Sequence, residues 1–81
     1  MGKEVEVKIL GNKYSFITDK NPEKALKIAT FVDELGRKIK EEEPYSSENT
    51  IAILTALNIA DKYFALADEI EKLKRYISDL E

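Results

Sequence analysis

The chain has 81 residues, of which 36% are charged and 43% hydrophobic, and its formal net charge is −3. It contains no cysteine and no histidine, which excludes disulfides and a Cys/His zinc site. A single domain of this length buries little surface, so oligomerisation is the means of stabilisation that remains open.

The same composition limits the compartment and the class of partner. No apolar run approaches the roughly 20 residues that span a bilayer, and Met1–Glu4 has no apolar signal-peptide core. We therefore expect a cytoplasmic protein that does not bind membranes. The excess of acid also argues against nucleic-acid binding, because no surplus of Lys and Arg is available to displace counterions from phosphate.

The first segment predicts a β-hairpin over residues 4–17. Apolar side chains alternate with polar ones at Val5, Val7, Ile9, Tyr14 and Phe16. This period of two is typical of a half-buried strand. Gly11-Asn12 lies between the two runs and suits a two-residue hairpin loop. Because an isolated hairpin is marginal in water, it should lie on a helix, pair with another copy, or both.

A helix is expected over residues 22–42, with Asn21 as its N-cap and Pro22 in its first turn. An apolar stripe of three-four spacing runs along it at Ala25, Ile28, Val32, Leu35 and Ile39, widened by Leu26, Ala29 and Phe31. Gly36 is interpreted as a site of close helix packing. The acidic run before Pro44 is interpreted as a solvated face rather than a cation site.

A second and much longer helix is expected over residues 47–80, capped by Ser46 or Ser47. One apolar stripe follows a heptad rhythm through Ala52, Ala56, Ile59, Tyr63, Leu66, Ile70, Leu73, Ile77 and Leu80. A second stripe runs beside it through Ile53, Leu57, Ala60, Phe64 and Ala67. The next position of the second stripe is Glu71, so only one stripe continues to the end of the helix.

This change predicts an α+β chain in two parts. Residues 1–67 form a head of hairpin and helices, and residues 68–81 extend the long helix into a coiled coil. Ile alternating with Leu along the heptad stripe favours a parallel two-stranded coil, and Glu69 and Lys74 fall at the flanking positions that meet across it. The partner helix must come from another copy or another protein.

No catalytic constellation is visible, so we expect no enzyme activity and no cofactor. The chain has no His to act as a base beside a Ser, no Cys nucleophile and no glycine-rich phosphate loop. Asn58 and Asp61 interrupt the apolar part of the long helix on one face. We interpret Asn58 as satisfying backbone groups of the hairpin or the interhelix loop, with direct partner binding as the alternative.

Three segments resemble the bacterial cell-division family ZapA. They are Val5-Glu6-Val7-Lys8-Ile9-Leu10-Gly11 followed by Tyr14, then Phe31-Val32-Asp33-Glu34, and above all Ile53-Leu54-Thr55-Ala56-Leu57-Asn58-Ile59-Ala60-Asp61. The resemblance implies a non-enzymatic protein that binds FtsZ, the tubulin-like GTPase of the division ring, and cross-links or bundles its protofilaments at mid-cell. It also implies a head-to-head homodimer, with a homotetramer as the further possibility.

The resemblance places the FtsZ contact on exposed positions near the hairpin turn and the start of the long helix, here Asn12, Lys13, Glu48 and Asn49. The family often has Arg after the hairpin glycine, where this chain has Asn12, and Lys13 can supply the charge instead. We expect the oligomer interface at Ile59, Tyr63, Leu66, Ile70, Leu73, Ile77 and Leu80. The alternatives are a coiled-coil adaptor with a different protein partner and a dimeric DNA-binding regulator, although Glu4 and Glu6 suit DNA poorly.

Overall fold

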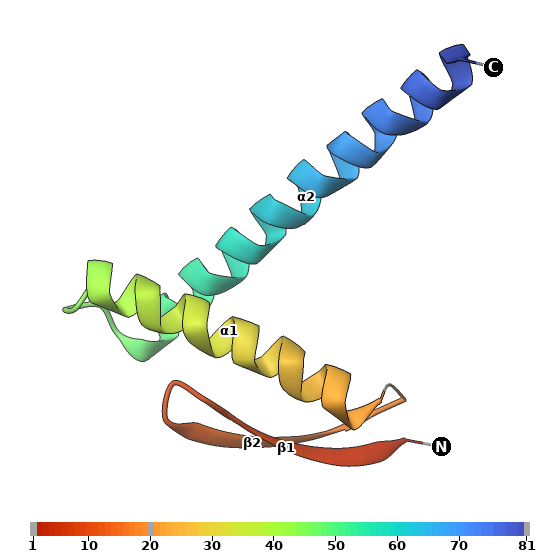
Figure 1. Cartoon of the computed structure of the whole chain (residues 1–81). Helices are drawn as coiled ribbons and strands as arrows, with labels where there is room; N and C mark the ends of the chain where they lie inside the picture. Colours follow the sequence, from red (N-terminus) through yellow and green to blue (C-terminus); the bar gives the residue numbers. More distant parts are fainter. Residues whose placement is uncertain (1, 20, 81) are drawn as a thin grey trace.

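The computed structural model describes residues 2–19 and 21–80. The chain folds as β1 (Lys3–Ile9), β2 (Asn12–Thr18), α1 (Pro22–Glu42) and α2 (Glu48–Leu80). Helix α1 lies across one face of the hairpin, and α2 turns back from its end and diverges from it (Figure 1). The described residues extend over 51 × 38 × 14 Å, so one copy is an open, thin V. The predicted α+β architecture is confirmed.

The hairpin is antiparallel, and its register places Val5 opposite Phe16 and Val7 opposite Tyr14. Val5 and Val7 are buried against Ala25 and Ala29 of α1, which confirms the predicted inward face. Burying each valine stabilises the fold by roughly 1.5–3 kcal/mol. The β2 side chains on the same face stay exposed, because α1 covers the β1 half of the hairpin better than the β2 half.

The hairpin turn differs from the prediction by one residue. Leu10 and Gly11 form the two-residue loop, both with positive φ (51° and 84°), and Asn12 instead pairs with Ile9 in the ladder. A leucine in the left-handed region costs about 1–2 kcal/mol. Contacts with α1 offset this cost, because the Leu10 N–H donates to Asp33 Oδ1 at 2.7 Å.

Helix α1 begins and ends as the sequence predicts. The Asn21 side chain accepts a hydrogen bond from the Glu23 N–H at 2.9 Å, Pro22 opens the first turn, and the Glu43 N–H closes the last turn on the Ile39 carbonyl. The predicted stripe is only partly correct, because Ile28 is 48% exposed whereas its neighbour Ala29 is buried. Small side chains face the hairpin, since they let helix and strand approach closely.

Gly36 is buried, and it packs closely against the hairpin turn rather than against another helix. A Cβ at this position would lie 3.3 Å from both Leu10 Cδ atoms. The missing side chain therefore makes room for Leu10. Close packing was the correct interpretation of Gly36, but the partner is a loop residue 26 positions away in the chain.

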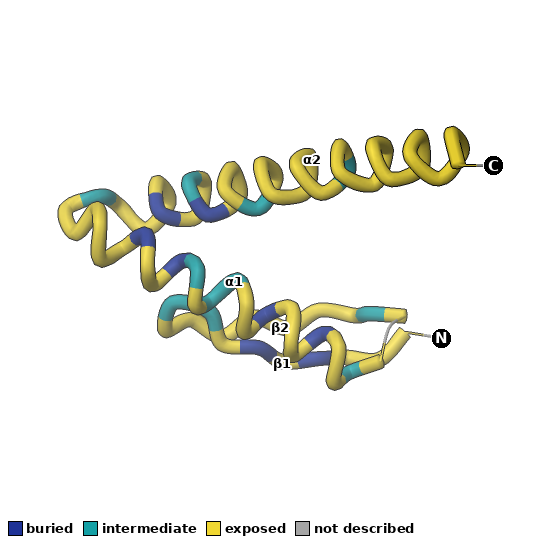
Figure 2. The backbone as a smooth tube through the Cα atoms, turned by 45° about the horizontal axis from the view of Figure 1, so that its top comes forward, coloured by how far each residue is buried: buried dark blue, intermediate teal, exposed yellow. Residues whose placement is uncertain are grey.

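Helix α2 begins at Glu48, with Ser47 as its cap. The Ser47 hydroxyl accepts from the Thr50 N–H at 3.1 Å and donates to the Thr50 hydroxyl at 3.0 Å. Ile51 is 2% exposed and Thr55 is also buried, its hydroxyl donating to the Ile51 carbonyl at 2.7 Å. Past these first turns the helix leaves α1, and Figure 2 shows it almost wholly exposed to its end.

The expectation that no segment reaches membrane-spanning length needs correction at α2. By length and composition alone this helix is long and apolar enough to cross a bilayer, and only 11% of its most apolar window is buried within the chain. A helix that packs in the core of an assembly passes the same test. Asp61 and Lys62 lie in the middle of α2, and a bilayer would have to accommodate both charges.

Candidate functional site

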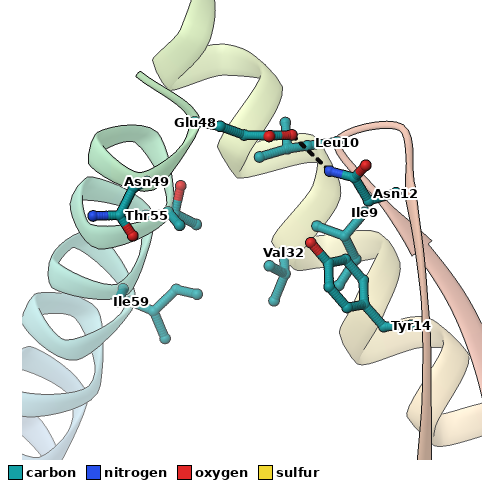
Figure 3. A pocket seen from close by; sticks show the side chains of 11 residues that line it. Ile9, Leu10, Asn12, Tyr14, Val32, Glu48, Asn49, Thr55 and Ile59 are labelled. Atoms are coloured by element: carbon teal, nitrogen blue, oxygen red, sulfur yellow. Dashed lines mark hydrogen bonds between the residues drawn. The ribbon is translucent and has the colours of Figure 1, made fainter. Parts of the chain in front are cut away.

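An apolar groove opens between the arms of the V. Its volume is about 580 Å³. Ile59 on α2 and Val32 on α1 face each other across it, and Tyr14 on β2 forms its far wall (Figure 3). The full lining comprises Ile9, Leu10, Asn12, Tyr14, Val32, Glu48, Asn49, Ala52, Thr55, Ala56 and Ile59. An apolar surface of this kind marks an interaction site, because water is a poor occupant for it.

The groove continues into a much larger uncovered apolar surface on α2. Both predicted stripes are exposed in one copy, at Ile53, Leu57, Tyr63, Phe64, Leu66, Ile70, Leu73, Ile77 and Leu80. Within the chain, Tyr63 packs edge-on against Phe64, with the ring centroids 5.1 Å apart. The chain alone therefore supplies no cover for this helix.

The residues predicted to form the oligomer interface lie along α2 as the heptad rhythm requires. Ile59 is half-buried and lines the groove, whereas the six positions from Tyr63 to Leu80 are exposed. This row of predicted interface residues from Ile59 to Leu80, called the seam below, begins inside the groove and continues along the exposed part of the helix. Its role as an interface stays a prediction.

The polar rim of the groove holds three of the four residues predicted to bind a partner. The Asn12 amide donates to Glu48 Oε1 at 2.6 Å, which joins the hairpin to the first turn of α2 (Figure 3). Asn49 lines the groove from the α2 side. Asn12 and Glu48 are both exposed. They are 36 positions apart in the chain, so the fold brings together residues that the sequence places in separate elements.

Lys13 lies on the other face of the hairpin. Its cross-strand partner is Lys8, so two like charges face each other on the surface that points away from α1. Among the described residues no carboxylate lies within ion-pair distance of either lysine. Lys13 therefore adjoins Asn12 in sequence but presents its charge on a different side of the turn.

Sequence reasoning gave no role at this site to two residues that shape it. Asp33 holds the hairpin turn, and Thr55 is the buried polar residue of α2. Val32, predicted as part of the apolar stripe of α1, lines the groove. The sequence gives no signal for the role of Asp33, because a carboxylate on an amphipathic helix is ordinarily solvated. Conversely, Asn58 does not serve the hairpin or the interhelix loop. Its amide donates to the Leu54 carbonyl of its own helix at 3.2 Å.

In the part of the chain that the structure describes, no group of three or more carboxylate, histidine or cysteine side chains could hold a metal ion. The site therefore consists of exposed polar residues at the rim and apolar residues in the groove. Such a surface can bind a protein segment with an apolar face and polar edges.

Comparison with known proteins agrees with this architecture. The family model for cell division protein ZapA matches residues 5–81. Cell division protein ZapA of Bacillus licheniformis is 34% identical over 73 residues, covering 90% of this chain and 86% of the relative. The Bacillus subtilis protein of the same name is 32% identical over 73 residues, with the same two coverages.

A solved structure has the same fold. A ZapA mutant dimer from Geobacillus stearothermophilus superimposes with a TM-score of 0.77 at 28% sequence identity. The match covers 96% of this chain and 91% of that one. Fold, length and sequence thus agree across nearly the whole molecule, and the chain belongs to the ZapA family of cell division proteins.

Proposed function

We propose that this protein is a non-enzymatic division adaptor that binds FtsZ polymers and cross-links their protofilaments at mid-cell in the cytoplasm. The observation that carries the proposal is the exposed apolar surface of the groove and the seam. The described part of one copy has no further element that could cover this surface. Membership of the ZapA family supports the division role. Bundling requires at least two FtsZ-binding surfaces in one particle, and self-association supplies them.

The second copy fills the groove with its own α2. This helix is the longest apolar element of the chain, and its first turns already form one wall of the groove. In a two-fold dimer the contact is reciprocal, so each α2 enters the groove of the other copy. Ala52 and Ala56 suit this arrangement, because small side chains let two helices approach closely. The Geobacillus relative is a dimer, which supports self-association of this chain.

The seam then continues as the coiled coil of residues 68–81, outside a head of residues 1–67. The 14 residues of the tail make only two heptads, which is too short to dimerise strongly alone. The groove in the head therefore provides much of the interface. A homotetramer needs a further surface beyond the groove and seam.

The FtsZ contact lies at the hairpin turn and the start of α2, on Asn12, Lys13, Glu48 and Asn49. Three of these residues, Asn12, Glu48 and Asn49, line the mouth of the groove, and the Asn12–Glu48 hydrogen bond already fixes the hairpin against α2 within one copy. Two such surfaces per dimer raise the avidity for a polymer without new contacts at either one. A single weak contact is then sufficient for stable cross-linking.

Co-sedimentation with GTP-assembled FtsZ from the same organism tests the proposal, with a sample lacking GTP as its control. We expect the protein to pellet with polymer and to increase light scattering. A monomeric variant, Leu57→Asp, should bind polymer weakly without bundling it. If the wild-type protein stays in the supernatant at low salt while FtsZ assembles normally, the protein is a coiled-coil adaptor of a different partner.

A further inference from the structure

The conformation of the hairpin turn is not determined by its own sequence. Leu10 and Gly11 both have positive φ, at 51° and 84°, and a turn of this kind is usually built from Asn-Gly or Asp-Gly. Leucine has no side-chain oxygen that could satisfy its own backbone in the left-handed region. Something outside the turn must therefore hold Leu10 in place.

Two residues of α1, one turn apart, hold Leu10. Asp33 Oδ1 accepts the Leu10 N–H at 2.7 Å, and the bare backbone at Gly36 receives the Leu10 side chain. Asp33 is itself oriented, because its other oxygen pairs with Arg37 Nε at 3.1 Å. The Asp33 side chain is only 15% exposed, against 67% for Arg37, so the contact with Leu10 is the better shielded of the two.

The anchoring of Leu10 also affects the position of the proposed FtsZ contact. Asn12 and Lys13 follow the turn directly, and Asn12 hydrogen-bonds to Glu48 at the start of α2. The hairpin tip, defined as residues 10–13, is thus held by α1 on one side and by α2 on the other. Its place relative to both helices depends on tertiary contacts rather than on the turn.

We propose that Asp33 is a positioning residue for partner binding. Its hydrogen bond to Leu10 and its ion pair with Arg37 lie outside the proposed FtsZ surface, yet it sets where Asn12 and Lys13 stand relative to Glu48 and Asn49. A protofilament surface is rigid and repetitive, so a tip free to move would lose affinity through the cost of ordering it on binding. This inference rests on the proposed function of the tip.

The test compares three variants of the 81-residue chain. Asp33→Ala removes the acceptor, and we expect roughly ten-fold weaker co-sedimentation with FtsZ polymer. Asp33→Asn keeps an acceptor oxygen and should restore most of the binding. Arg37→Ala removes the ion pair but leaves the bond to Leu10, so its binding should stay near that of the wild type. Sedimentation velocity checks that each variant remains dimeric.

Amide hydrogen exchange supplies a readout that does not involve FtsZ. The Leu10 amide should exchange faster in Asp33→Ala, while amides in the middle of α1 keep their protection. If Asp33→Ala does not fold, the double variant Asp33→Ala/Leu10→Asn restores a locally favoured Asn-Gly turn without the anchor. We expect this double variant to fold as a dimer and still bind FtsZ weakly.

The outcomes separate the two proposals. Normal binding by a folded Asp33→Ala dimer, or by the double variant, would overturn the positioning role while the FtsZ proposal stands. Unchanged exchange at Leu10 would overturn it as well, because the anchor would then not hold the turn. A wild-type protein that fails to pellet with FtsZ would overturn the proposed function and, with it, this role for Asp33.

Discussion

The hairpin tip and the tail of α2, residues 68–80, are held in place by different means. The tip has a hydrogen bond and a packing contact to α1 and a further hydrogen bond to α2, all within one copy. Every described residue of the tail is exposed. One copy therefore specifies its hairpin tip completely and leaves its tail to be specified by another molecule.

This difference separates two tasks in one small chain. The tip is built to present polar groups in a fixed geometry, which recognition of a partner requires. The tail presents apolar side chains at heptad spacing, whose position becomes defined only by association. Substitutions in the tail should therefore change the dimer, whereas substitutions around the tip should change the fold of one copy or its binding.

The largest expected effect comes from Leu57→Asp in the middle of the second apolar stripe. Leu57 is 61% exposed in one copy, so the single chain should tolerate the change. A buried unpaired carboxylate in the dimer would weaken association by about 3–5 kcal/mol. Analytical ultracentrifugation measures the shift to monomer. Lys72→Asp, on an exposed face of the tail outside both stripes, is the matched control and should remain dimeric.

An intact Leu57→Asp dimer would show that the second stripe is not an interface. The exposed apolar surface of the head would then have to be explained in another way. A Lys72→Asp variant that dissociates as readily would point to a general effect of charge on α2. Only the combination of one monomer and one dimer supports the distinction between the stripes and the remaining faces of the helix.

How far the sequence alone could predict this structure differs between the same two regions. The seam of α2 could be predicted, because its residues recur at heptad spacing within one helix and this spacing places them on one face. The tip was not, because Leu10 has no intrinsic preference for its conformation and its partner Asp33 lies 23 positions away. From sequence, a carboxylate on an amphipathic helix is expected to be solvated. Only the fold shows that Asp33 accepts a hydrogen bond from the Leu10 N–H.

The face of α1 illustrates a related limit. Ile28 and Ala29 both fit a three-four spacing with Ala25 and Val32, so periodicity cannot say which one meets the hairpin. The structure buries Ala29 and leaves Ile28 exposed, since the strand approaches too closely for a large side chain. Apolar pattern thus identifies candidates for burial, whereas backbone separation decides among them.

Leu73→Ala tests the seam in the tail. Leu73 is 59% exposed in one copy, and Arg75, at the heptad position that points away from a coiled-coil partner, is also exposed. If the heptad register is correct, Leu73→Ala should weaken the dimer by about 2 kcal/mol, and Arg75→Ala by less than about 0.5 kcal/mol. Concentration-dependent thermal unfolding measures both. Equal losses for the two variants would contradict the register.

Gly36→Val tests the tip from the side of α1. The added side chain would occupy the space of Leu10, and overpacking of this kind costs about 1–3 kcal/mol. Lys38→Val, at an exposed position of the same helix, shows what a valine costs where it meets no side chain, and should cost only a few tenths of a kcal/mol. Urea unfolding compares them. A Gly36→Val protein as stable as Lys38→Val would mean that Leu10 can move aside freely.

The smallest expected effect concerns the orientation of the two tails. In a parallel coil Glu69 of one copy meets Lys74 of the other, and each such exposed pair contributes about 0.5 kcal/mol. Glu69→Lys should therefore weaken the dimer slightly, and the double variant Glu69→Lys/Lys74→Glu should restore it. The effect should fade at high salt, because exposed charges are screened. If the double variant is no more stable than the single one, the two residues do not meet, and the tails run antiparallel or in a different register.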